Sequence, residues 1–415
     1  MKNLSVALLA GVIACLVPAG VAAKTKPGNL TVLHSFGGDG DGVYPEASLL
    51  YLNGTLYGTT NGGGTATDGH GCGCGTVFAL DPVTDAEHVV YSFCARRKCV
   101  DGSPPISSLV AVKGTLYGTT RWGGVYDAGT VFAVDPKTGK ERVLHSFAAG
   151  QDGASPYGTL IDVEGTLYGT TQAGGSSWDG TAYSIDPQTG AEKVLYSFCS
   201  QPACSDGARP EASLTNVHGE LYGTTYNGGN TGCNGYGCGT IFALDRVSGA
   251  ETVIHALAGR KDGEFPATGL THFKGILYGT TLYGGANRLP YGTVFSVDPK
   301  SGAETVLHSF CNVGNCRDGR FPEAGLVAFG GVLYGTTALG GDGGNCDDEN
   351  CGTIFAVDPN TGAETVLHAF CRQNMRCADG AYPEAGLIVV NGTLYGTTGE
   401  GGARLLYGTV FAISP

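Results

Sequence analysis

Four glutamates stand at equivalent places in a repeated motif, each directly after a proline: Glu46, Glu211, Glu323 and Glu384. The other three copies of the motif carry Ile106, Tyr157 and Ala267 at this place. If the repeats form a ring, these carboxylates gather at one end of its centre, where they would bind a cation or sugar hydroxyls. The alternative is that they are solvated rim carboxylates or partners of turn amides.

The two tryptophans of the chain, Trp122 and Trp178, lie in the same kind of glycine-rich loop in neighbouring repeats, accompanied by Arg121, Tyr126 and Asp179. Flat aromatic rings stack on sugars and planar polar groups bond to hydroxyls, so this set predicts carbohydrate binding. The alternative is that each tryptophan packs over its own loop as a small satellite core. Related loops contain Tyr283, Arg288, Tyr291, Arg404 and Tyr407.

The sequence offers no assignable catalytic group. One strand position holds histidine in five repeats and tyrosine in two, which indicates a structural role because acid–base catalysis needs one positioned group. The residues are His34, Tyr91, His145, Tyr196, His255, His308 and His368. With no Ser/His/Asp order and no metal-ligand cluster, we expect no cofactor. A structural calcium ion is the alternative, held by aspartates of glycine-rich loops: Asp39, Asp41, Asp342, Asp347 and Asp348.

Fourteen of the 15 cysteines form pairs that are local in sequence. An even number in an exported chain indicates disulfides, and zinc is disfavoured because no pair has the usual spacing or a histidine partner. Six disulfides are predicted: Cys94–Cys99, Cys199–Cys204, Cys233–Cys238, Cys311–Cys316, Cys346–Cys351 and Cys371–Cys377. Between Cys72 and Cys74 there is a single residue, which would force a strained ring, so the state of this pair is left open.

A repeat positions all these residues. The sequence Leu-Tyr-Gly-Thr-Thr occurs seven times, and its tyrosines lie 51 to 61 residues apart. A period of this size predicts stacked or radial repeats. Each repeat contains four short strand-like runs, broken by turns such as Asn53-Gly54 and Asp81-Pro82.

Four antiparallel strands in each of seven repeats predict a seven-bladed β-propeller, an all-β fold. Residues 30–36 match a fourth strand and the chain ends on a third strand, so we expect the N-terminal strand to complete the last blade. A β-solenoid is the alternative, but it would need capping units. The predicted blades cover residues 45–93, 105–147, 156–198, 210–257, 266–310, 322–370, and 383–413 plus 30–36, within one domain of residues 24–415.

The layout from Pro45 through Leu56-Tyr57 and Gly62-Gly63 to Asp81-Pro82 resembles kelch-type blades, although Val or Leu replaces the tryptophan of the next strand. It is more similar to the GloVer tandem-repeat proteins, exported bacterial chains of Tyr-Gly-Thr-Thr, Gly-Gly and Gly-Thr-Val-Phe repeats that often end in a surface anchor. The resemblance covers residues 30–415 and implies an exported bacterial propeller. It implies no activity for particular residues, and the C-terminal anchor is not recognised in this sequence.

Residues 1–23 predict a signal peptide. Lys2 precedes the apolar run Leu4–Val17, and Val21 and Ala23 precede the expected cut. Cys15 loosely fits a lipoprotein box, which makes lipid anchoring the alternative to release. No later segment reaches the roughly 18 apolar residues that a membrane span needs.

The chain has 37 acidic and 24 basic residues, and a charge of -13 disfavours nucleic acids and anionic membranes as partners. We expect a monomer that is secreted, periplasmic or at the cell surface. In a propeller, the second-to-third and fourth-to-first connections share one face, and here these loops are long, variable and rich in cysteine, which is typical of a working face.

The favoured function is therefore non-catalytic binding or surface interaction, with an extracellular glycan or protein as ligand. The alternative is an extracellular propeller enzyme: a polysaccharide lyase, a hydrolase or a lactonase. A lyase would need a histidine or tyrosine base beside an arginine or a metal at the channel mouth, whereas a binding protein needs only stacking and hydrogen-bonding groups.

Overall fold

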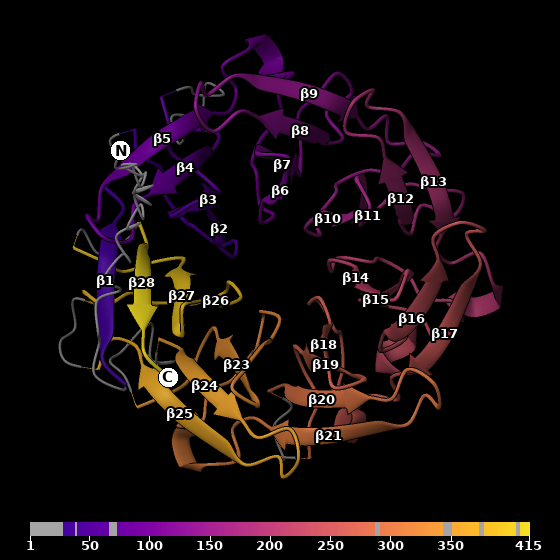
Figure 1. The fold of residues 1–415 in the computed structure, drawn as a ribbon. Coiled ribbons are helices and arrows are strands. Elements are labelled where there is room, and N and C mark those ends of the chain that lie inside the picture. Colours follow the sequence, from indigo (N-terminus) through magenta and orange to yellow (C-terminus); the bar gives the residue numbers. More distant parts are fainter. Residues whose placement is uncertain are drawn as a thin grey trace, which may run out of the picture.

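Seven four-stranded antiparallel sheets stand around a central axis in the computed structural model of the chain (Figure 1). The structure describes residues 28–37, 40–65, 73–286, 291–342, 351–372, 377–403 and 407–415. Among these residues there is no α-helix, and no helix that could cross a membrane. The predicted seven-bladed β-propeller is confirmed, and the predicted signal peptide, with Cys15, lies outside the described residues.

The first strand of each blade faces the axis and the fourth lies on the outer rim (Figure 1). Blades 1 to 3 consist of β2 (Leu50–Leu52), β3 (Thr55–Thr60), β4 (Thr76–Leu80) and β5 (Glu87–Ser92); β6 (Val110–Val112), β7 (Thr115–Thr120), β8 (Thr130–Val134) and β9 (Glu141–Ser146); and β10 (Ile161–Val163), β11 (Thr166–Thr171), β12 (Thr181–Ile185) and β13 (Glu192–Ser197). Blades 4 and 5 consist of β14 (Thr215–Val217), β15 (Glu220–Thr225), β16 (Thr240–Asp245) and β17 (Glu251–Ala256); and β18 (Thr271–Phe273), β19 (Ile276–Thr281), β20 (Thr293–Val297) and β21 (Glu304–Ser309). Blades 6 and 7 consist of β22 (Val327–Phe329), β23 (Val332–Thr337), β24 (Thr353–Val357) and β25 (Glu364–Ala369); and β26 (Ile388–Val390), β27 (Thr393–Thr398), β28 (Thr409–Ile413) and β1 (Leu30–Ser35).

The repeated Gly-Thr-Thr sequence has a packing reason at each position. In β7, a Cβ on Gly118 would lie 2.6 Å from the ring of Phe132 on β8, so only glycine leaves room for that ring. Thr120 bonds through its hydroxyl to Thr130 of the neighbouring strand at 2.8 Å, and both side chains are buried. A buried hydroxyl needs such a partner, and the pairing ties the second strand to the third.

The first threonine of the motif joins neighbouring blades. Thr59 donates from its hydroxyl to the carbonyl of Ser107 in blade 2 at 3.0 Å, and Thr397 donates to the carbonyl of Ala47 at 3.3 Å. The second bond links blade 7 to blade 1, so the same device that joins successive blades also closes the ring.

The ends of the chain complete one sheet. β1 pairs antiparallel with β28, with Leu30 opposite Ile413 and Ser35 opposite Thr409. The sheet order is β1-β28-β27-β26, so the N-terminal strand is the outer strand of the last blade, as predicted. This pairing leaves no unpaired third strand at the junction of the ends.

The cores lie between blades. A phenylalanine that follows the outer strand packs edge to face against the aromatic ring of the third strand of the next blade, as with Phe93 and Phe132, whose centroids are 4.9 Å apart. At the junction of the ends, Phe370 and Phe411 make the same contact at 5.5 Å. These rings are buried, which makes each blade dependent on its neighbours.

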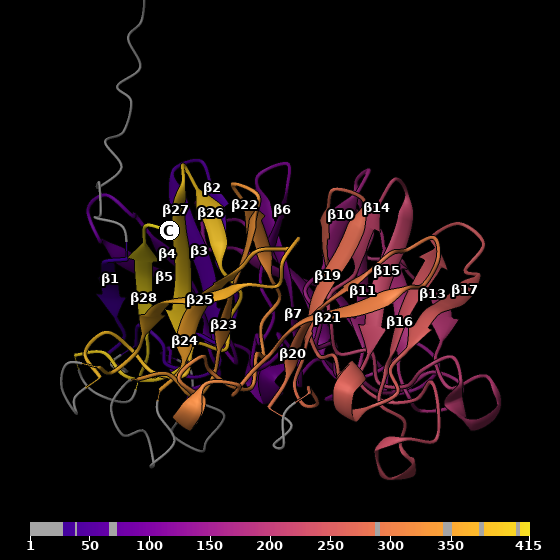
Figure 2. The same ribbon diagram turned by 90° about the horizontal axis from the view of Figure 1, so that it is seen from below.

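The long connections gather on one face, opposite the short hairpin turns (Figure 2). Five 3-10 turns lie in these connections: η1 (Arg97–Cys99), η2 (Pro202–Cys204), η3 (Cys233–Gly235), η4 (Arg260–Asp262) and η5 (Gly314–Cys316). We call this the loop face. The following local disulfides stiffen it: Cys94–Cys99, Cys199–Cys204, Cys233–Cys238, Cys311–Cys316 and Cys371–Cys377.

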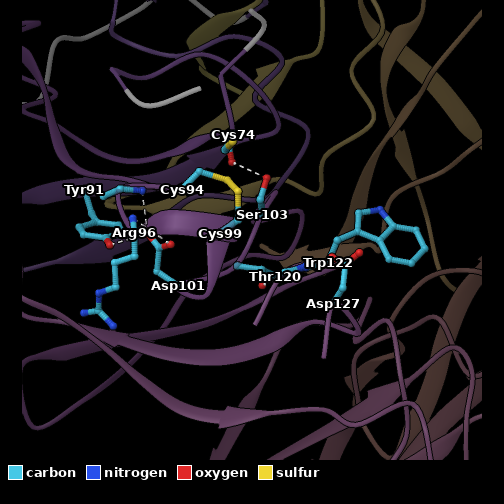
Figure 3. Close-up of a disulfide and its surroundings, with 12 residues drawn as sticks. Cys74, Tyr91, Cys94, Arg96, Cys99, Asp101, Ser103, Thr120, Trp122 and Asp127 are labelled. Atoms are coloured by element: carbon cyan, nitrogen blue, oxygen red, sulfur yellow. Dashed lines mark hydrogen bonds between the residues drawn. A yellow bond between two sulfur atoms is a disulfide. The ribbon is translucent and has the colours of Figure 1, made fainter. Parts of the chain in front are cut away.

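The remaining cysteines fall partly outside the description. Cys351 is disulfide-bonded, while its predicted partner Cys346 lies outside the described residues. Cys72 is also outside them, and Cys74 is buried, with its sulfur within 4.8 Å of the sulfurs of Cys94 and Cys99 (Figure 3).

Candidate binding site at the mouth of the central channel

The four glutamates that follow the repeat prolines line a hollow of about 140 Å³ on the axis, to which all seven blades contribute. The chain turns toward the axis through a left-handed residue before each of these prolines, for example Arg209 with φ 57°. Such a conformation directs the start of the first strand inward. The sequence thus predicted correctly that Glu46, Glu211, Glu323 and Glu384 surround the axis.

Three of these carboxyls lie on the adjacent blades 6, 7 and 1, and we call them the acidic arc: Glu323, Glu384 and Glu46. Burial raises the pKa of Glu384 to about 8, and the negative charges of Glu323 and Glu46 add to the rise. Burial also raises the pKa values of Glu323 and Glu46. At neutral pH the Glu384 carboxyl is therefore mostly protonated and uncharged, which makes it a potential hydrogen-bond donor to a ligand.

Glu211, on blade 4, has a different environment. Its carboxylate accepts hydrogen bonds from Gln172 Nε2 at 2.6 Å and from an Arg209 guanidinium nitrogen at 2.9 Å. The guanidinium of Arg209 lies over the ring of Tyr226, 5.3 Å from its centroid. At the channel mouth, the carboxyls of the acidic arc therefore repel one another, whereas the Glu211 carboxylate on the opposite side is paired with an arginine.

Arg121 joins two aromatic residues at the mouth. Its guanidinium lies 5.0 Å from the centroid of the Trp122 ring and 5.5 Å from that of Tyr157. Tyr157 lines the axial hollow, and the charges of Glu211 and Glu46 act on its hydroxyl. Burial, the largest cause, raises the pKa of Tyr157, so its hydroxyl stays protonated and is available to donate a hydrogen bond to a ligand.

A second hollow, of about 650 Å³, opens on the loop face between blades 1 and 2. Trp122, Asp127 and the Cys94–Cys99 disulfide region frame it, and the indole ring extends away from the disulfide (Figure 3). Asn61 lines this hollow and donates from Nδ2 to Glu46 at 2.9 Å. Asn61 therefore stands between the tryptophan and the acidic arc.

Further aromatic rings continue around the mouth through blades 4 to 6. Tyr226 stacks on Phe265 at 4.8 Å between centroids and 18° between planes. Tyr283 contacts both Phe265, at 6.0 Å, and Phe321, at 5.4 Å. Glu211 and Glu323 both act on the Tyr226 hydroxyl, which places this aromatic row beside the carboxylates.

Among the described residues, Trp178, Tyr126 and Asp179, which were also predicted for carbohydrate binding, line neither hollow. Trp178 and Tyr126 are 66% and 62% exposed, and Asp179 accepts a backbone hydrogen bond from Arg209 at 2.7 Å through its carbonyl. Arg288 and Arg404 lie outside the described residues. The structure thus brings Trp122 and Arg121 to the glutamates and leaves Trp178 in a separate loop.

Sequence reasoning missed Asn61, Tyr226 and Phe265 as site residues. Asn61 and Tyr226 directly follow the repeated Thr-Thr, as Arg121 does, while Phe265 directly precedes the repeat proline. Each position comes at the same point of every repeat, so a comparison of the seven copies at these two positions could have found them. The signal was hidden because their residue types vary from copy to copy.

The repeated histidines lie on the outer rim, away from the mouth. Each has its Nε2 within 3.4 Å of a carboxylate oxygen of the aspartate in the following Asp-Gly turn, as in the pair of His255 Nε2 and Asp262 Oδ2 at 3.3 Å. Tyr91 makes the equivalent bond to Asp101 through its hydroxyl at 2.8 Å. Both side chains reach the same carboxylate, which explains why they replace one another.

Of the aspartates considered for calcium, the two that the structure describes, Asp41 and Asp342, lie in connections of different blades. Asp41 bonds to the backbone nitrogen of Gly37 at 2.9 Å, whereas Asp342, on blade 6, pairs with Arg317 at 2.7 Å. Asp39, Asp347 and Asp348 lie outside the described residues. A calcium site therefore stays a prediction.

Comparison with known families gives one match: the Gloeobacter/Verrucomicrobia repeat matches residues 18–236 and 230–415. No curated protein matches the chain.

Several solved structures are similar to this chain at low sequence identity. The extracellular domain of a hybrid two-component system from B. thetaiotaomicron is 13% identical, with a TM-score of 0.52, over 91% of this chain and 41% of that one, so this chain spans about two fifths of that relative. An oligogalacturonate lyase in complex with manganese is 13% identical with a TM-score of 0.49 over 95% of both chains. A chain of a nidogen/laminin complex is 15% identical with a TM-score of 0.42, over 71% of this chain and 91% of that one.

Proposed function

The chain belongs to the Gloeobacter/Verrucomicrobia repeat family, and we propose that it is an exported propeller that binds an extracellular glycan at the mouth of its channel. The observation that carries this proposal is a continuous row of contacts, in which the Arg121 guanidinium lies over the rings of both Trp122 and Tyr157. This row lies beside carboxylates of other blades. Aromatic faces next to planar polar groups match the alternating apolar faces and hydroxyls of a sugar. Disulfides on the loop face fit an oxidising compartment outside the cytoplasm.

The charges at the mouth favour a neutral or amine-bearing glycan. Glu323, Glu384 and Glu46 already oppose one another's ionisation, so a ligand carboxylate placed beside them would meet the same repulsion. A sugar hydroxyl instead accepts a hydrogen bond from protonated Glu384, and an ammonium group would be attracted to the acidic arc. Polyuronates should therefore bind more weakly than neutral polymers.

The test is a titration with hydroxyethyl cellulose, chitosan oligosaccharides and polygalacturonate, followed by tryptophan fluorescence and calorimetry. We expect a neutral or amine-bearing polymer to bind, and Trp122→Ala to lower the affinity at least tenfold, about 1.4 kcal/mol. Because the indole is 45% exposed, the same substitution should change the free energy of unfolding by less than about 1 kcal/mol.

Trp178→Ala is the matched control, since Trp178 lies in the equivalent loop but lines neither hollow; it should bind like the wild type. If Trp122→Ala binds normally, or if polygalacturonate is the preferred polymer, the proposed site is wrong.

One observation favours a second candidate, an extracellular polysaccharide hydrolase. A carboxyl with a pKa of about 8, as in Glu384, is protonated at neutral pH and suits a general acid, with Glu323 or Glu46 as the second carboxylate. New reducing ends released from the same polymers by the wild type but not by Glu384→Gln would move the protein to this class. A tyrosine-based lyase is less well supported, because the pKa of Tyr157 is raised and a base would need it lowered.

A further inference from the structure

Similar clusters of polar side chains lie on the outer rim, one at each contact between neighbouring blades. In each, a His or Tyr of an outer strand meets the aspartate of its own Asp-Gly turn, and in six clusters a glutamate that opens the outer strand of the next blade points at the pair. The six glutamates are Glu87, Glu141, Glu192, Glu251, Glu304 and Glu364. Each carries the electrostatic influence of that aspartate, for example Asp101 on Glu141 and Asp262 on Glu304.

The seventh cluster lacks the glutamate. It lies where blade 6 meets the N-terminal strand, and there His368 Nε2 contacts Asp379 Oδ2 at 2.9 Å. Leu30 opens β1 at the place where the other outer strands begin with glutamate. We call this junction the seam cluster, consisting of His368, Asp379 and Leu30.

The backbones of the two neighbouring outer strands are also further apart at the seam. In five of the other six contacts, a glycine two residues before the glutamate touches the preceding outer strand so closely that a Cβ on Gly139 would lie 2.6 Å from the Val90 carbonyl, and one on Gly249 2.5 Å from that of Leu195. Before Glu87 this place is held by Asp85. At the seam, a Cβ on Gly28 would lie 4.0 Å from the Leu367 carbonyl. The seam is therefore more open by an observation independent of the missing carboxyl.

A cavity of about 380 Å³ occupies this opening. Its lining includes His368, Asp379 and Leu30, together with Asn29 and Arg372, which bring polar groups from both sides. The cavity lies between β25 and β1, and it shares no lining residue with the axial hollow. Both strands lie on the outer rim, at the other side of their sheets from the strands nearest the axis (Figure 1).

The other clusters show which chemical group fits such a place. At the contact of blades 1 and 2, the Glu141 carboxylate pairs with an Arg96 guanidinium nitrogen at 2.8 Å and accepts a bond from the Tyr91 hydroxyl at 3.5 Å. Arg96 reaches it from the connection that follows the outer strand of blade 1, and Arg372 occupies the corresponding connection of blade 6. The seam thus retains an arginine, an aspartate and a histidine around a space where, among the described residues, no glutamate takes the place that it has at the other contacts.

We propose that the seam cavity binds a small organic acid, whose carboxyl group takes the place that a glutamate fills at the other contacts between blades. Arg372 pairs with the ligand carboxylate as Arg96 pairs with Glu141, and the Asp379–His368 pair and Asn29 provide the remaining polar contacts. The cavity exceeds the volume of a glutamate side chain, so it admits acids larger than propionate, including a sugar acid. This site is independent of the glycan site, and a failure of one leaves the other standing.

The test uses propionate and glucuronate, each with a neutral counterpart, propionamide and glucose, in calorimetric titrations of the full chain. We expect both acids to bind saturably with a millimolar or tighter Kd, and the neutral compounds not to bind. Arg372→Ala should lower the affinity at least tenfold. Leu30→Glu should abolish binding, because its own carboxyl fills the cavity.

Thr31→Glu is the matched control. It adds the same charge to β1 one residue further, where the side chain points to the opposite face of the strand, so it should bind the acids like the wild type. No binding by the wild type, equal binding of the neutral compounds, or unchanged binding in Arg372→Ala would each overturn the proposal. If Leu30→Glu fails to fold, Arg372→Ala and the neutral compounds still decide it.

Discussion

Glu384 shows how one residue type acquires different chemistry from its surroundings. Glu211 occupies the equivalent position in blade 4, yet an arginine and a glutamine stabilise its charge, whereas Glu384 is buried beside other carboxyls. Burial and like charges both favour the neutral acid. Equivalent positions in a repeat protein therefore need not have equivalent electrostatic surroundings.

This difference predicts a pH-dependent effect of Glu384→Gln. The pKa of Glu384 is raised from 4.5 to about 8 in the folded protein, so its carboxyl favours folding below pH 4.5 and this contribution is lost as the pH rises through 8. Glutamine cannot ionise, so we expect the variant to have a higher Tm than the wild type at pH 9 and a nearly equal Tm at pH 5. Thermal unfolding at both pH values measures this.

Glu211→Gln is the control for that experiment. Its carboxylate is paired with Arg209 at 2.9 Å, so the substitution removes a favourable charge and should not raise the Tm at pH 9. A similar gain in both variants would show that the effect comes from the net charge of the protein and not from the acidic arc.

The sequence predicted the positions of the glutamates but not their pKa values or their hydrogen-bond partners. The proline-glutamate repeat was enough to place Glu46 and Glu384 on the axis. The contacts of Asn61 and Tyr157 came only from the structure. Asn61 bonds to Glu46 from another loop of the same blade, and Tyr157 lies beside Arg121 of the neighbouring blade. Pairings between loops of different repeats have no periodic signal in the chain.

At the scale of elements, the disulfides were the easier part to predict. The five pairs described in full close loops between cysteines five or six residues apart, and each spans one connection of the loop face. Local spacing fixed these pairings without knowledge of the fold. The 3-10 turns inside four of them were not predicted, because three residues are too few to show a helical period.

Because each disulfide closes only a short loop, we expect its removal to lower the free energy of unfolding by a modest amount. Closing a loop of about five residues restricts the unfolded chain by about 2 kcal/mol in the chain-entropy model. We expect a variant with Cys199→Ser and Cys204→Ser to lose about this amount of stability in urea unfolding, while it keeps the strand content of the wild type. A loss well above that value would mean that the disulfide also holds the contacts between blades 3 and 4.

The N-terminal strand should contribute far more to the stability of the fold than any single loop. β1 provides the outer strand of the last blade, and Phe36, directly after it, packs on Phe78 of blade 1 at 5.2 Å. A chain that begins after residue 36 would expose the edge of β28 and lose this buried ring. We expect it to aggregate or to lose cooperative unfolding, as measured by light scattering and thermal melting.

A matched truncation distinguishes that loss from a general effect of shortening. Removing residues 1–27 leaves β1 and its pairing with β28 intact. This shorter chain should stay monomeric and unfold cooperatively. If the longer truncation behaves in the same way, the ring closes without its outermost strand.

At the scale of the whole molecule, the rim glutamates form a proton-binding ring. Burial raises the pKa values of Glu87, Glu141, Glu192, Glu251 and Glu364 to about 7 and that of Glu304 to about 8. The neighbouring aspartates reinforce the rise, and at Glu141 the Arg96 charge opposes it. These residues repeat around the ring, so their effects on stability act in the same direction.

The ring predicts that the propeller is more stable in mild acid than in mild alkali. Each carboxyl binds its proton more tightly in the folded state, so its contribution is complete below pH 4.5 and is lost between that value and about 7 to 8. The raised pKa of His255 acts in the same direction, while the lowered pKa values of His34 and His145 oppose it around pH 6. Asp262, with a pKa of about 2, matters only in stronger acid.

We therefore expect the Tm at pH 5 to exceed that at pH 8.5 by more than about 3 °C. Substituting Glu251→Gln and Glu304→Gln together removes two of the six groups and should reduce this difference, because the Tm at pH 8.5 rises while that at pH 5 changes little. Asp85→Asn, at an exposed position, removes an acidic charge without touching the ring and should leave the difference unchanged. A Tm that is independent of pH across this window would mean that the rim carboxyls ionise freely, and that water or a cation compensates them between the blades.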